Sequence, residues 1–324
     1  MNVAIFGYGN LGRGVEDAVS RCPDMTLVAV FTRRDPQSLK LQTPGVPAVS
    51  ADEILGWKDK VDVLFLCGGS ATDLPQMTPE LAKHFNVVDS FDNHSRIPEH
   101  FAAVDAAAKE HKTTALISAG WDPGMFSLNR LYGNCILPQG SDYTFWGKGV
   151  SQGHSDAIRR IPGVVDARQY TVPVQEAMDR VRRGENPQLT TREKHTRECF
   201  VVIEDGADPE AIRQQIVTMP AYFADYDTTV TFITKEEMEK NHAQLPHGGS
   251  VLRTGVTGKD HKQVIEYKLT LDSNPEFTGS VLAAYGRAVC RMASRGDYGC
   301  KTVFDVAPVD LSVLPREHLL ANML

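Results

Sequence analysis

The fold is decided by the stretch MNVAIFGYGNLGRG at residues 1–14. Residues 3–6 form a short apolar run that is typical of a buried parallel strand. The run continues into a turn from Gly7 to Gly12 that fits G-x-G-x-x-G, and then into apolar residues at helical spacing. In such a turn the first glycine permits the tight bend, the second lets a pyrophosphate approach the backbone, and the third lets helix and strand pack closely. Because a helix start offers free N–H groups and the positive end of its dipole, the stretch predicts dinucleotide binding.

The rest of the first 120 residues alternates between apolar runs and helical segments. Buried strands are predicted at residues 25–31, 61–67, 86–89 and 113–118, with helices between them that include a short one at 52–60. This alternation predicts an α/β fold with a Rossmann-type, doubly wound parallel sheet. Ligands of such sheets bind at the carboxyl ends of the strands, so the loops after these runs are the expected site.

Composition and charge restrict the classes of function. The chain has 324 residues, 42% of them hydrophobic and 23% charged, which suits a globular protein of two domains. Its formal net charge is −7 and it has no long basic run, so no nucleic-acid partner is expected. No apolar stretch approaches the ~20 residues of a membrane span and no leader-peptide pattern is present, so no membrane partner is expected. Six scattered cysteines without a C-x-x-C pair predict mostly buried, reduced thiols, no metal site and a cytoplasmic location.

The end of the second predicted strand indicates which dinucleotide binds. This position faces the adenosine ribose in nucleotide-binding units, and an Asp or Glu there favours NAD. Here the residues are Thr32, Arg33 and Arg34, a hydroxyl and two guanidinium groups without a carboxylate. Arginine pairs well with a phosphate dianion, so the pattern favours NADP. The alternative is a solvated pair of arginines at a strand end.

The pattern changes near residue 125, where a helix at 125–132 precedes long alternating stretches. Two helices, near residues 173–183 and 209–218, interrupt a set of predicted strands at residues 143–146, 164–171, 198–204, 228–234 and 263–271. This order predicts a second, antiparallel α+β domain. A long helix at residues 277–295 follows, and a short apolar run at 303–306 is expected to return to the first domain.

Two aspartates, Asp92 and Asp122, follow successive predicted strands of the first domain. Their loops are neighbours at the carboxyl edge of the sheet, so both carboxylates are expected beside the nicotinamide. Two close carboxylates repel, and one has a raised pKa unless a cation such as a substrate ammonium lies between them. Such an aspartate could also move protons. The alternative is that they cap helices, since Asp122 precedes Pro123 in a favoured N-cap arrangement.

Polar residues of the second domain suit a substrate that carries a carboxylate beside an amine. Thr171 lies at the end of a predicted strand and Arg197 lies just before another. His247 and Asn274 fall in the polar loops Pro-His-Gly-Gly and Asp-Ser-Asn-Pro. Each of these residues alone is also typical of an ordinary surface or loop position.

Two further groups are open to more than one interpretation. Residues 151–156, Ser-Gln-Gly-His-Ser-Asp, are too crowded for a hydrolase triad and are predicted to form a turn whose backbone N–H groups hold an anion. Core packing is the default expectation for the large aromatic residues Trp121, Phe145 and Trp146, and the alternative is that they wall a pocket.

A series of motifs along the chain points to a known family. They are Gly-Tyr-Gly-Asn-Leu-Gly-Arg (7–13), Phe-Thr-Arg-Arg (31–34), Asp-Asn-His (92–94), Gly-Trp-Asp-Pro-Gly-Met-Phe (120–126), Phe-Trp-Gly (145–147), Ser-Gln-Gly-His-Ser-Asp-Ala (151–157), Arg-Arg-Ile-Pro-Gly-Val (159–164), Pro-His-Gly-Gly (246–249) and Asn-Pro-Glu-Phe-Thr (274–278). With these motifs in order, essentially the whole chain resembles meso-diaminopimelate dehydrogenase, an NADP-dependent enzyme family of bacterial lysine metabolism.

The resemblance implies a reaction and the residues that serve it. Ammonia is removed oxidatively from the D-centre of meso-2,6-diaminopimelate, by hydride transfer to the nicotinamide and hydrolysis of the imine, to give L-2-amino-6-oxopimelate. Asp92 and Asp122 are the implied catalytic pair at the reacting end. Further substrate contacts are implied at Trp121, Trp146, Gln152 and Gly153, and at Thr171, Arg197, His247 and Asn274, which match the positions that grip the distal L-centre. NADP contacts are implied at Gly7, Tyr8, Gly9, Asn10, Leu11, Gly12, Thr32, Arg33, Arg34, Cys67, Gly68, Gly69, Ser70, Ser90, Phe91, Asp92, Ala119, Gly120, Trp121, Asp122 and Pro123.

The resemblance also implies a domain organisation, and three rival functions remain. Residues 1–121 are expected to form the NADP-binding Rossmann domain, joined by residues 275–324, and residues 122–274 a substrate-binding and dimerisation domain of a homodimer. The rivals are a broader-range D-amino acid dehydrogenase of the same family, a reductase such as homoserine dehydrogenase, and a non-catalytic NADPH-binding protein. Loss of Asp92 or Asp122 would mark the last, and both are present.

Overall fold

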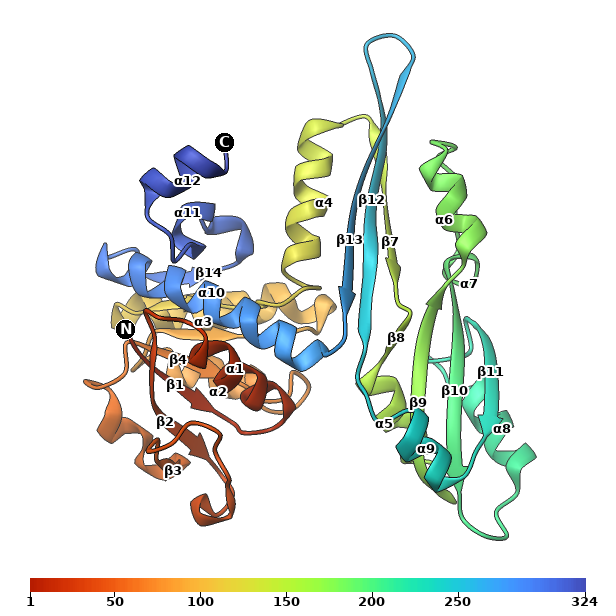
Figure 1. The fold of residues 1–324 in the computed structure, drawn as a ribbon, viewed down its shortest axis with the longest axis horizontal. Helices are drawn as coiled ribbons and strands as arrows, with labels where there is room; N and C mark the ends of the chain where they lie inside the picture. Colours follow the sequence, from red (N-terminus) through yellow and green to blue (C-terminus); the bar gives the residue numbers. More distant parts are fainter. The chain divides into compact units, whose positions relative to one another are not determined.

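The computed structural model describes residues 1–324 and divides into two compact units (Figure 1). The first unit comprises Met1–Leu128 and Pro275–Leu324, and the second comprises Asn129–Asn274. The division falls a few residues after the expected border between residues 121 and 122, because Met125 and Leu128 pack against the core of the first unit.

A seven-stranded, fully parallel sheet forms the centre of the first unit. Its strand order is β14-β6-β5-β4-β1-β2-β3, so β1 is an inner strand and the chain winds outward on both sides of it. This order confirms the predicted Rossmann-type fold. The strands are β1 (Asn2–Phe6), β2 (Thr26–Thr32), β3 (Ala48–Ser50), β4 (Val63–Leu66), β5 (Val87–Asp89), β6 (Thr114–Leu116) and β14 (Gly299–Lys301).

Helices cover both faces of this sheet. On β1, Val3 and Ile5 belong to a core cluster shared with α1 and α10, whereas Ala4 and Phe6 belong to a second cluster shared with α2 and α3. Because successive side chains of a strand point to opposite faces, this alternation buries β1 on both sides. The helices of the unit are α1 (Asn10–Ser20), α2 (Leu74–Leu81), α3 (Ile97–His111), α10 (Asn274–Ser294), α11 (Pro308–Leu311) and α12 (Arg316–Asn322).

The segment at 303–306 returns to the first unit as expected, since Val303 and Val306 pack in its core. The strand that the C-terminal part of the chain adds to the sheet is β14, and the run at 303–306 itself forms a 3₁₀ turn at Val303–Asp305. Thr302 and Asp305 bond each other reciprocally in a capping box, which favours a turn over a strand at this point. The helix expected at 52–60 is a 3₁₀ helix at Ala51–Trp57.

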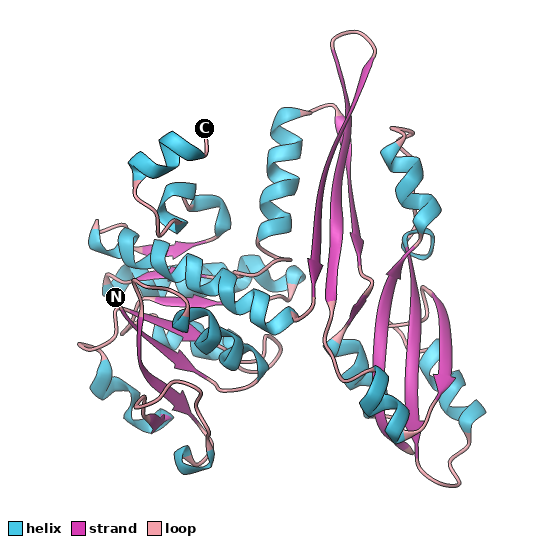
Figure 2. Cartoon of the chain, viewed as in Figure 1, coloured by secondary structure: helices cyan, strands magenta, loops and turns pink.

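The second unit contains two smaller sheets (Figure 2). The three-stranded sheet has the order β13-β12-β7 and the four-stranded sheet the order β11-β10-β9-β8. Strands β10 and β11 run parallel and the other pairs are antiparallel, so the predicted α+β unit contains one parallel pair. The strands are β7 (Gly140–Trp146), β8 (Gly149–Val150), β9 (Val164–Pro173), β10 (His195–Ile203), β11 (Asp227–Phe232), β12 (His247–Thr257) and β13 (His261–Leu271).

Helices α5 and α8 cover one face of the four-stranded sheet. Ile158 of α5 and Ile212 of α8 share a core cluster with Cys199 and Val201 of β10. Since alternate residues of a strand share a face, Arg197 lies on this same face, beyond its apolar part. The helices that involve the second unit are α4 (Met125–Ile136), α5 (Gln152–Arg159), α6 (Gln175–Arg182), α7 (Thr191–Lys194), α8 (Pro209–Val217) and α9 (Lys235–Asn241).

Strand β12 begins where the sequence predicted a polar loop. Glycine usually weakens a strand, but a Cβ at Gly248 would lie 2.2 Å from the Leu269 carbonyl oxygen on β13. The close approach of β13 therefore requires glycine at this position. The polar-loop expectation is also wrong for Asn274, which is the first residue of α10. Thr171 lies near the end of β9 as expected, whereas Arg197 lies inside β10 and not just before it.

Candidate functional site

The glycine turn has the geometry that a pyrophosphate site requires. Gly7 adopts a φ of 96°, and a Cβ at Gly12 would lie 2.1 Å from the Gly7 carbonyl oxygen, so no side chain fits at Gly12. A Cβ at Gly9 would meet no atom within 4 Å, which leaves open space beside the start of α1. Gly9 is also the N-cap of this helix and makes no side-chain bond to its first N–H groups. The residues present therefore fit a dinucleotide phosphate.

The residues expected to choose between NADP and NAD form a bonded cluster after β2. Thr32 Oγ1 accepts a hydrogen bond from Arg34 N at 3.0 Å, and Arg34 Nη2 donates to the Tyr8 carbonyl oxygen at 2.6 Å. Arg33 pairs with Asp73 at 2.8 Å, although 64% of its side chain stays exposed. Exposed ion pairs contribute little to stability. Both guanidinium groups can therefore donate hydrogen bonds to a phosphate dianion without breaking a fully buried contact.

The loop after β4 is shaped by Asp73. Its Oδ2 accepts a hydrogen bond from Gly69 N at 2.9 Å, and a Cβ at Gly68 would lie 2.7 Å from the Asp73 Cβ. The Gly69 hydrogen bond, with a smaller effect of Arg33, holds the pKa of Asp73 below its ordinary value. Burial raises the pKa of the Cys67 thiol to about 12, so this loop begins with a neutral thiol.

Tyr8 lies in the glycine turn, but its side chain is part of the core. Its ring is 5% exposed and its hydroxyl donates to Glu16 Oε2 at 2.5 Å. Burial, with the Glu16 carboxylate as a lesser cause, raises the pKa of Tyr8 to about 12. Glu16 Oε1 also accepts hydrogen bonds from Gln42 N and Thr43 N. Tyr8 thus contributes its backbone to the turn, while its side chain joins Glu16 in anchoring the loop at 40–43.

A buried carboxylate ties together the loops after β5 and β6. Asp89 is fully buried, and its Oδ1 accepts hydrogen bonds from Phe91 N at 3.0 Å and from Ser118 N at 2.9 Å. Its Oδ2 accepts from Thr78 Oγ1 at 2.7 Å and lies 2.7 Å from His100 Nε2. Sequence reasoning missed Asp89, because an aspartate at the end of a strand carries no signal that distinguishes a buried hub from a loop residue.

Asp92 and Asp122 follow β5 and β6, which are hydrogen-bonded neighbours, so both lie at the expected edge of the sheet. Asp92 N donates to Ser70 Oγ at 3.1 Å and thereby links the loops after β4 and β5. Helix α4 begins three residues after Asp122, at Met125. Trp121 is 8% exposed and packs edge-on against Phe126, with ring centroids 5.2 Å apart.

Arg197 is a buried cation of the second unit that has no acidic partner. It is 6% exposed, and its Nη1 donates to the hydroxyl of Thr171, which lies opposite it on β9. Its guanidinium lies over the ring of Tyr226, with Cζ 3.8 Å from the ring centroid, and its Nε has no hydrogen-bond partner. Burial lowers the pKa of Arg197 from its ordinary value. An uncompensated buried guanidinium is costly, so this arrangement suits an anionic ligand.

His247 is held as a neutral hydrogen-bond donor at the start of β12. Its Nδ1 accepts from Gly248 N at 2.8 Å and lies farther, at 3.2 Å, from the Gly248 carbonyl oxygen. The Gly248 N–H fits the tautomer with its proton on Nε2, and the Gly248 carbonyl fits the tautomer with its proton on Nδ1. Burial lowers the pKa of His247, and the charge of Arg197 acts in the same direction. A neutral imidazole with a proton on Nε2 can donate a hydrogen bond to a carboxylate.

Trp146 is fixed by a histidine from the other sheet. His195 Nε2 accepts a hydrogen bond from Trp146 N at 2.8 Å, and the two rings stack with centroids 5.3 Å apart. Burial, with smaller effects of the Arg197 and Lys194 charges, lowers the pKa of His195 to about 3, so the imidazole is neutral. Sequence reasoning missed His195, because its contact with Trp146 depends on how two sheets meet.

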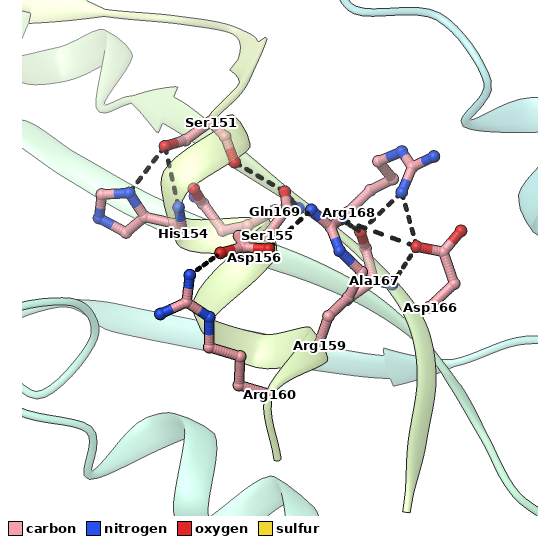
Figure 3. A network of polar contacts seen from close by, with 10 residues as sticks. All are labelled: Ser151, His154, Ser155, Asp156, Arg159, Arg160, Asp166, Ala167, Arg168 and Gln169. Atoms are coloured by element: carbon pink, nitrogen blue, oxygen red, sulfur yellow. Dashed lines mark hydrogen bonds and ion pairs between the residues drawn. The ribbon is translucent and has the colours of Figure 1, made fainter. Parts of the chain in front are cut away.

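Residues 151–156 form the start of a helix, so the predicted turn is wrong (Figure 3). Ser151 is the N-cap of α5, and its Oγ lies 2.7 Å from His154 Nδ1 and 3.5 Å from His154 N. Ser155 Oγ accepts a hydrogen bond from Gln169 N at 3.0 Å, which fixes α5 on β9. The side-chain cap thus occupies the backbone N–H that the turn was expected to offer to an anion.

The predicted site residues separate into one set for each unit. The first unit holds the expected cofactor contacts at the strand ends, together with Trp121, Asp92 and Asp122. The second unit holds the remaining substrate residues, namely Trp146, exposed Gln152 and Gly153 in the first turn of α5, Thr171, Arg197, His247 and Asn274. Within this second set, Thr171 and Arg197 are bonded directly.

The six cysteines are all free. Cys199 and Cys300 are buried, Cys135 is exposed, and the other three, Cys22, Cys67 and Cys290, are partly buried, so fewer are fully buried than expected. No group of histidine, cysteine and acidic side chains in the chain has the arrangement to hold a metal ion. The chain has no helix with the length and apolar character that crossing a membrane requires.

Comparisons with known proteins show which family the chain belongs to. Residues 120–273 match the family model described as the diaminopimelic acid dehydrogenase C-terminal domain. The chain is 59% identical to the meso-diaminopimelate D-dehydrogenase of Ureibacillus thermosphaericus, and the match covers 100% of this chain and 99% of that protein. The chain belongs to the meso-diaminopimelate D-dehydrogenase family.

Solved structures of this family share the whole fold. A sixfold-substituted meso-dapdh from Clostridium tetani E88, crystallised with DAP, has a TM-score of 0.94 and 51% identity and covers 100% of this chain and 99% of its own. An engineered D-amino acid dehydrogenase bound to NADP+ has a TM-score of 0.88 and 45% identity, with the same coverage. The recognition of the family from its motifs and the predicted fold are confirmed.

Proposed function

We propose that the chain catalyses the NADP-dependent, reversible oxidative deamination of the D-centre of meso-2,6-diaminopimelate, giving L-2-amino-6-oxopimelate and ammonia. Membership of the family over the full length of the chain supports this reaction. The observation in the structure that carries the proposal is the buried guanidinium of Arg197, which has a hydroxyl partner and no carboxylate partner. The distal carboxylate of the substrate supplies the missing negative charge.

The pattern of substitutions in a relative supports the same assignment. The Clostridium tetani variant crystallised with DAP has substitutions at Gln, Thr, Arg, Pro, His and Asn. These residue types recur in this chain, in the same order and with the same spacing, at Gln152, Thr171, Arg197, Pro246, His247 and Asn274. Five of these residues are proposed substrate contacts here, and Pro246, which sequence reasoning missed, precedes His247 at the start of β12.

Asp92 and Asp122 are the proposed groups at the reacting D-centre. The carboxylates follow neighbouring strands and attract the substrate ammonium. NADP+, when bound, supplies the hydride acceptor for the D-carbon. The proton released by the ammonium passes to one of the two aspartates or to a water that they hold, and the same groups orient the water that hydrolyses the substrate imine. Holding both ends of the substrate explains how one stereocentre is chosen.

NADP is the proposed cofactor in preference to NAD. Arg33 and Arg34 are exposed after β2, and no carboxylate occupies the ribose position that would favour NAD. The family member bound to NADP+ supports this assignment. The residues proposed to hold the cofactor are those of the glycine turn, residues 32–34, and the loops after β4, β5 and β6.

A homodimer is the proposed assembly, formed through the second unit. Strand β13 is an edge strand of its sheet and exposes Val264 and Ile265, with 38% and 36% of their surface accessible. An exposed apolar edge strand is a common place for pairing with a second copy. The proposed compartment is the cytoplasm, which agrees with the six free cysteines.

The test is a rate measurement with identification of the products. The enzyme is given NADP+ and meso-diaminopimelate, NADPH is followed by absorbance, and ammonia and the amino-oxo acid are quantified by mass spectrometry. We expect equal amounts of NADPH and ammonia, a lower rate with NAD+, and a much lower rate with D-alanine. Comparable rates with D-alanine would establish the broader-range alternative, and no NADPH with any amino acid would refute the proposal.

A further inference from the structure

Three of the four buried side-chain polar atoms without a hydrogen-bond partner lie on the four-stranded sheet of the second unit. They are Gln169 Oε1, Arg197 Nε and Thr228 Oγ1, whereas the fourth, on Ser118, lies in the first unit. Buried polar atoms are nearly always bonded in folded proteins. Three unsatisfied atoms in one place therefore indicate a polar ligand that the chain itself does not supply.

The strand register places these atoms on one face. Arg197 of β10 is paired with Thr171 on β9 and with Thr228 on β11. Residues that are directly opposite one another on neighbouring strands share a face of the sheet, so the three form a Thr-Arg-Thr row across three strands. Gln169 lies two residues before Thr171 on β9 and shares that face.

The row carries a single positive charge that no neighbouring carboxylate neutralises. Glu198, the next residue on β10, pairs with Lys148 at 2.7 Å, and Asp227, the residue before Thr228, pairs with Arg192 at 2.7 Å. Burial and the charge of Arg197 lower the pKa of His154 to about 4, so this imidazole adds no charge. A hydroxyl, a guanidinium and a second hydroxyl in a row suit a carboxylate, because its two oxygens can accept several hydrogen bonds.

Tyr226 covers one face of the guanidinium. The Arg197 Cζ lies 3.8 Å from the centroid of the Tyr226 ring, and Tyr226 directly precedes β11. Stacking on an aromatic ring fixes the plane of a guanidinium while its N–H groups remain available around the edge. The same short segment of the chain therefore provides both the stacking ring and the second threonine.

We infer that the Thr228 hydroxyl donates a hydrogen bond to the distal carboxylate that Arg197 and Thr171 bind, and that Tyr226 is a positioning residue that holds Arg197 for this contact. The inference rests on the proposed function and extends its substrate site to β11. Thr228 and Tyr226 then contribute to selectivity for a substrate with a second carboxylate, although neither touches the reacting centre.

The test of Thr228 is the variant Thr228→Val, compared with Thr229→Val. Valine keeps the shape of threonine and removes the hydroxyl, and Thr229 is an exposed residue on the opposite face of the same strand. We expect Thr228→Val to raise KM for meso-diaminopimelate about 10- to 100-fold, with kcat within about twofold, because a hydrogen bond to a charged group is lost. Thr229→Val should leave both constants unchanged, and Thr228→Ser, which restores a hydroxyl, should lower KM toward the wild-type value.

The test of Tyr226 separates stacking from its hydroxyl. Tyr226→Phe keeps the ring and removes only the hydroxyl that also bonds Arg197, so it should raise KM for meso-diaminopimelate less than about threefold. Tyr226→Leu should raise this KM about 5- to 20-fold, since the stacking ring is lost as well. The KM for NADP+ should stay constant in both variants. Equal KM values for the leucine and phenylalanine variants would overturn the role of Tyr226.

The outcomes distinguish this inference from the proposed function. If the wild-type enzyme forms no NADPH from meso-diaminopimelate, the proposed function fails. If the wild-type enzyme is active and Thr228→Val has the same KM as Thr229→Val, only the role of Thr228 fails. Thermal unfolding of each variant shows whether it folds, and Thr228→Ala, which also removes the hydroxyl, provides the answer should the valine variant not fold.

Discussion

The two units assemble their functional residues in different ways. In the first unit the candidate residues follow strand ends in sequence order, beginning with the turn from Gly7 to Gly12 and ending with the loop of Asp122. In the second unit, Thr171, Arg197 and Thr228 come from three separate strands and meet only through register. A site at the edge of a parallel sheet can therefore be located from local sequence patterns. A site on the face of a sheet depends on pairing between distant segments.

The largest expected effect comes from a carboxylate of the first unit. Asp122→Asn should lower kcat by about 10²- to 10⁴-fold, because a group proposed to hold the ammonium and move a proton is neutralised. The affinity for NADPH, measured by fluorescence titration, should change little. Asp59→Asn, at an exposed position of the same unit, is the matched control. Retained turnover in the Asp122 variant would contradict its catalytic role and weaken the contrast between the units.

The second prediction concerns the buried cation of the second unit. Arg197→Met should raise KM for meso-diaminopimelate by about 10²- to 10³-fold, because the distal carboxylate loses a charged, buried partner. The unfolding temperature should not fall, since the substitution removes a buried charge that has no counter-ion. Arg192→Met is the control, because that side chain is 53% exposed and pairs with Asp227 at the surface. Similar KM values in the two variants would show that Arg197 does not bind the substrate.

The third prediction tests the selectivity of the cofactor site. Changing Arg33 and Arg34 together to alanine should raise KM for NADP+ about 10- to 100-fold and leave KM for NAD+ nearly constant, because only NADP+ carries the 2′-phosphate. The KM for meso-diaminopimelate at saturating cofactor is the internal control. Equal losses with both cofactors would argue against a phosphate contact at these arginines.

The smallest effect on function is expected at an ion pair outside the proposed site residues of both units. Asp24 accepts two hydrogen bonds from Arg287 of α10, at 2.6 and 2.8 Å, and these bonds hold the pKa of Asp24 below its ordinary value. Asp24→Asn should lower the free energy of unfolding by about 1–3 kcal/mol at neutral pH without changing KM for either substrate. Because the pKa of this carboxyl is depressed in the folded state, its contribution is present above the unfolded pKa and is lost as the pH falls.

The pH dependence of the unfolding free energy tests this contribution of Asp24. The difference in unfolding free energy between the wild-type enzyme and Asp24→Asn should be constant near neutral pH and should shrink below about pH 4, as Asp24 becomes protonated. Denaturant titrations at several pH values measure it. A difference that grows toward acidic pH would contradict the pairing of Asp24 with Arg287.

Much of the first unit could be predicted from its sequence. The glycine turn, the run of strands and the arginines after β2 are local signals, and each recurs in the structure at the expected place. Local signals could not predict the hydrogen bonds and packing of the buried side chains. Asp89 ties two loops through its buried carboxylate, and the side chain of Tyr8 packs into the core, because both depend on segments brought together only by the fold.

The second unit was less predictable. The candidates Thr171, Arg197 and His247 were identified, but Arg197 was placed just before a strand and His247 in a loop, since polar residues and a Gly-Gly pair usually weaken a strand. In the structure they lie in strands, where Gly248 is needed for the close approach of β13. Thr228 and His195 were missed, because a threonine or a histidine in a strand gains its role only from its cross-strand or inter-sheet neighbour.

The enzyme is proposed to oxidise the D-centre of meso-diaminopimelate and to leave its L-centre unchanged. The most direct test compares the rates of NADPH formation with meso- and LL-diaminopimelate, and determines the configuration of the centre that remains in the product. We predict turnover with the meso isomer, none with the LL isomer, and an L centre in the product. Similar rates with both isomers, or a D centre in the product, would contradict the account.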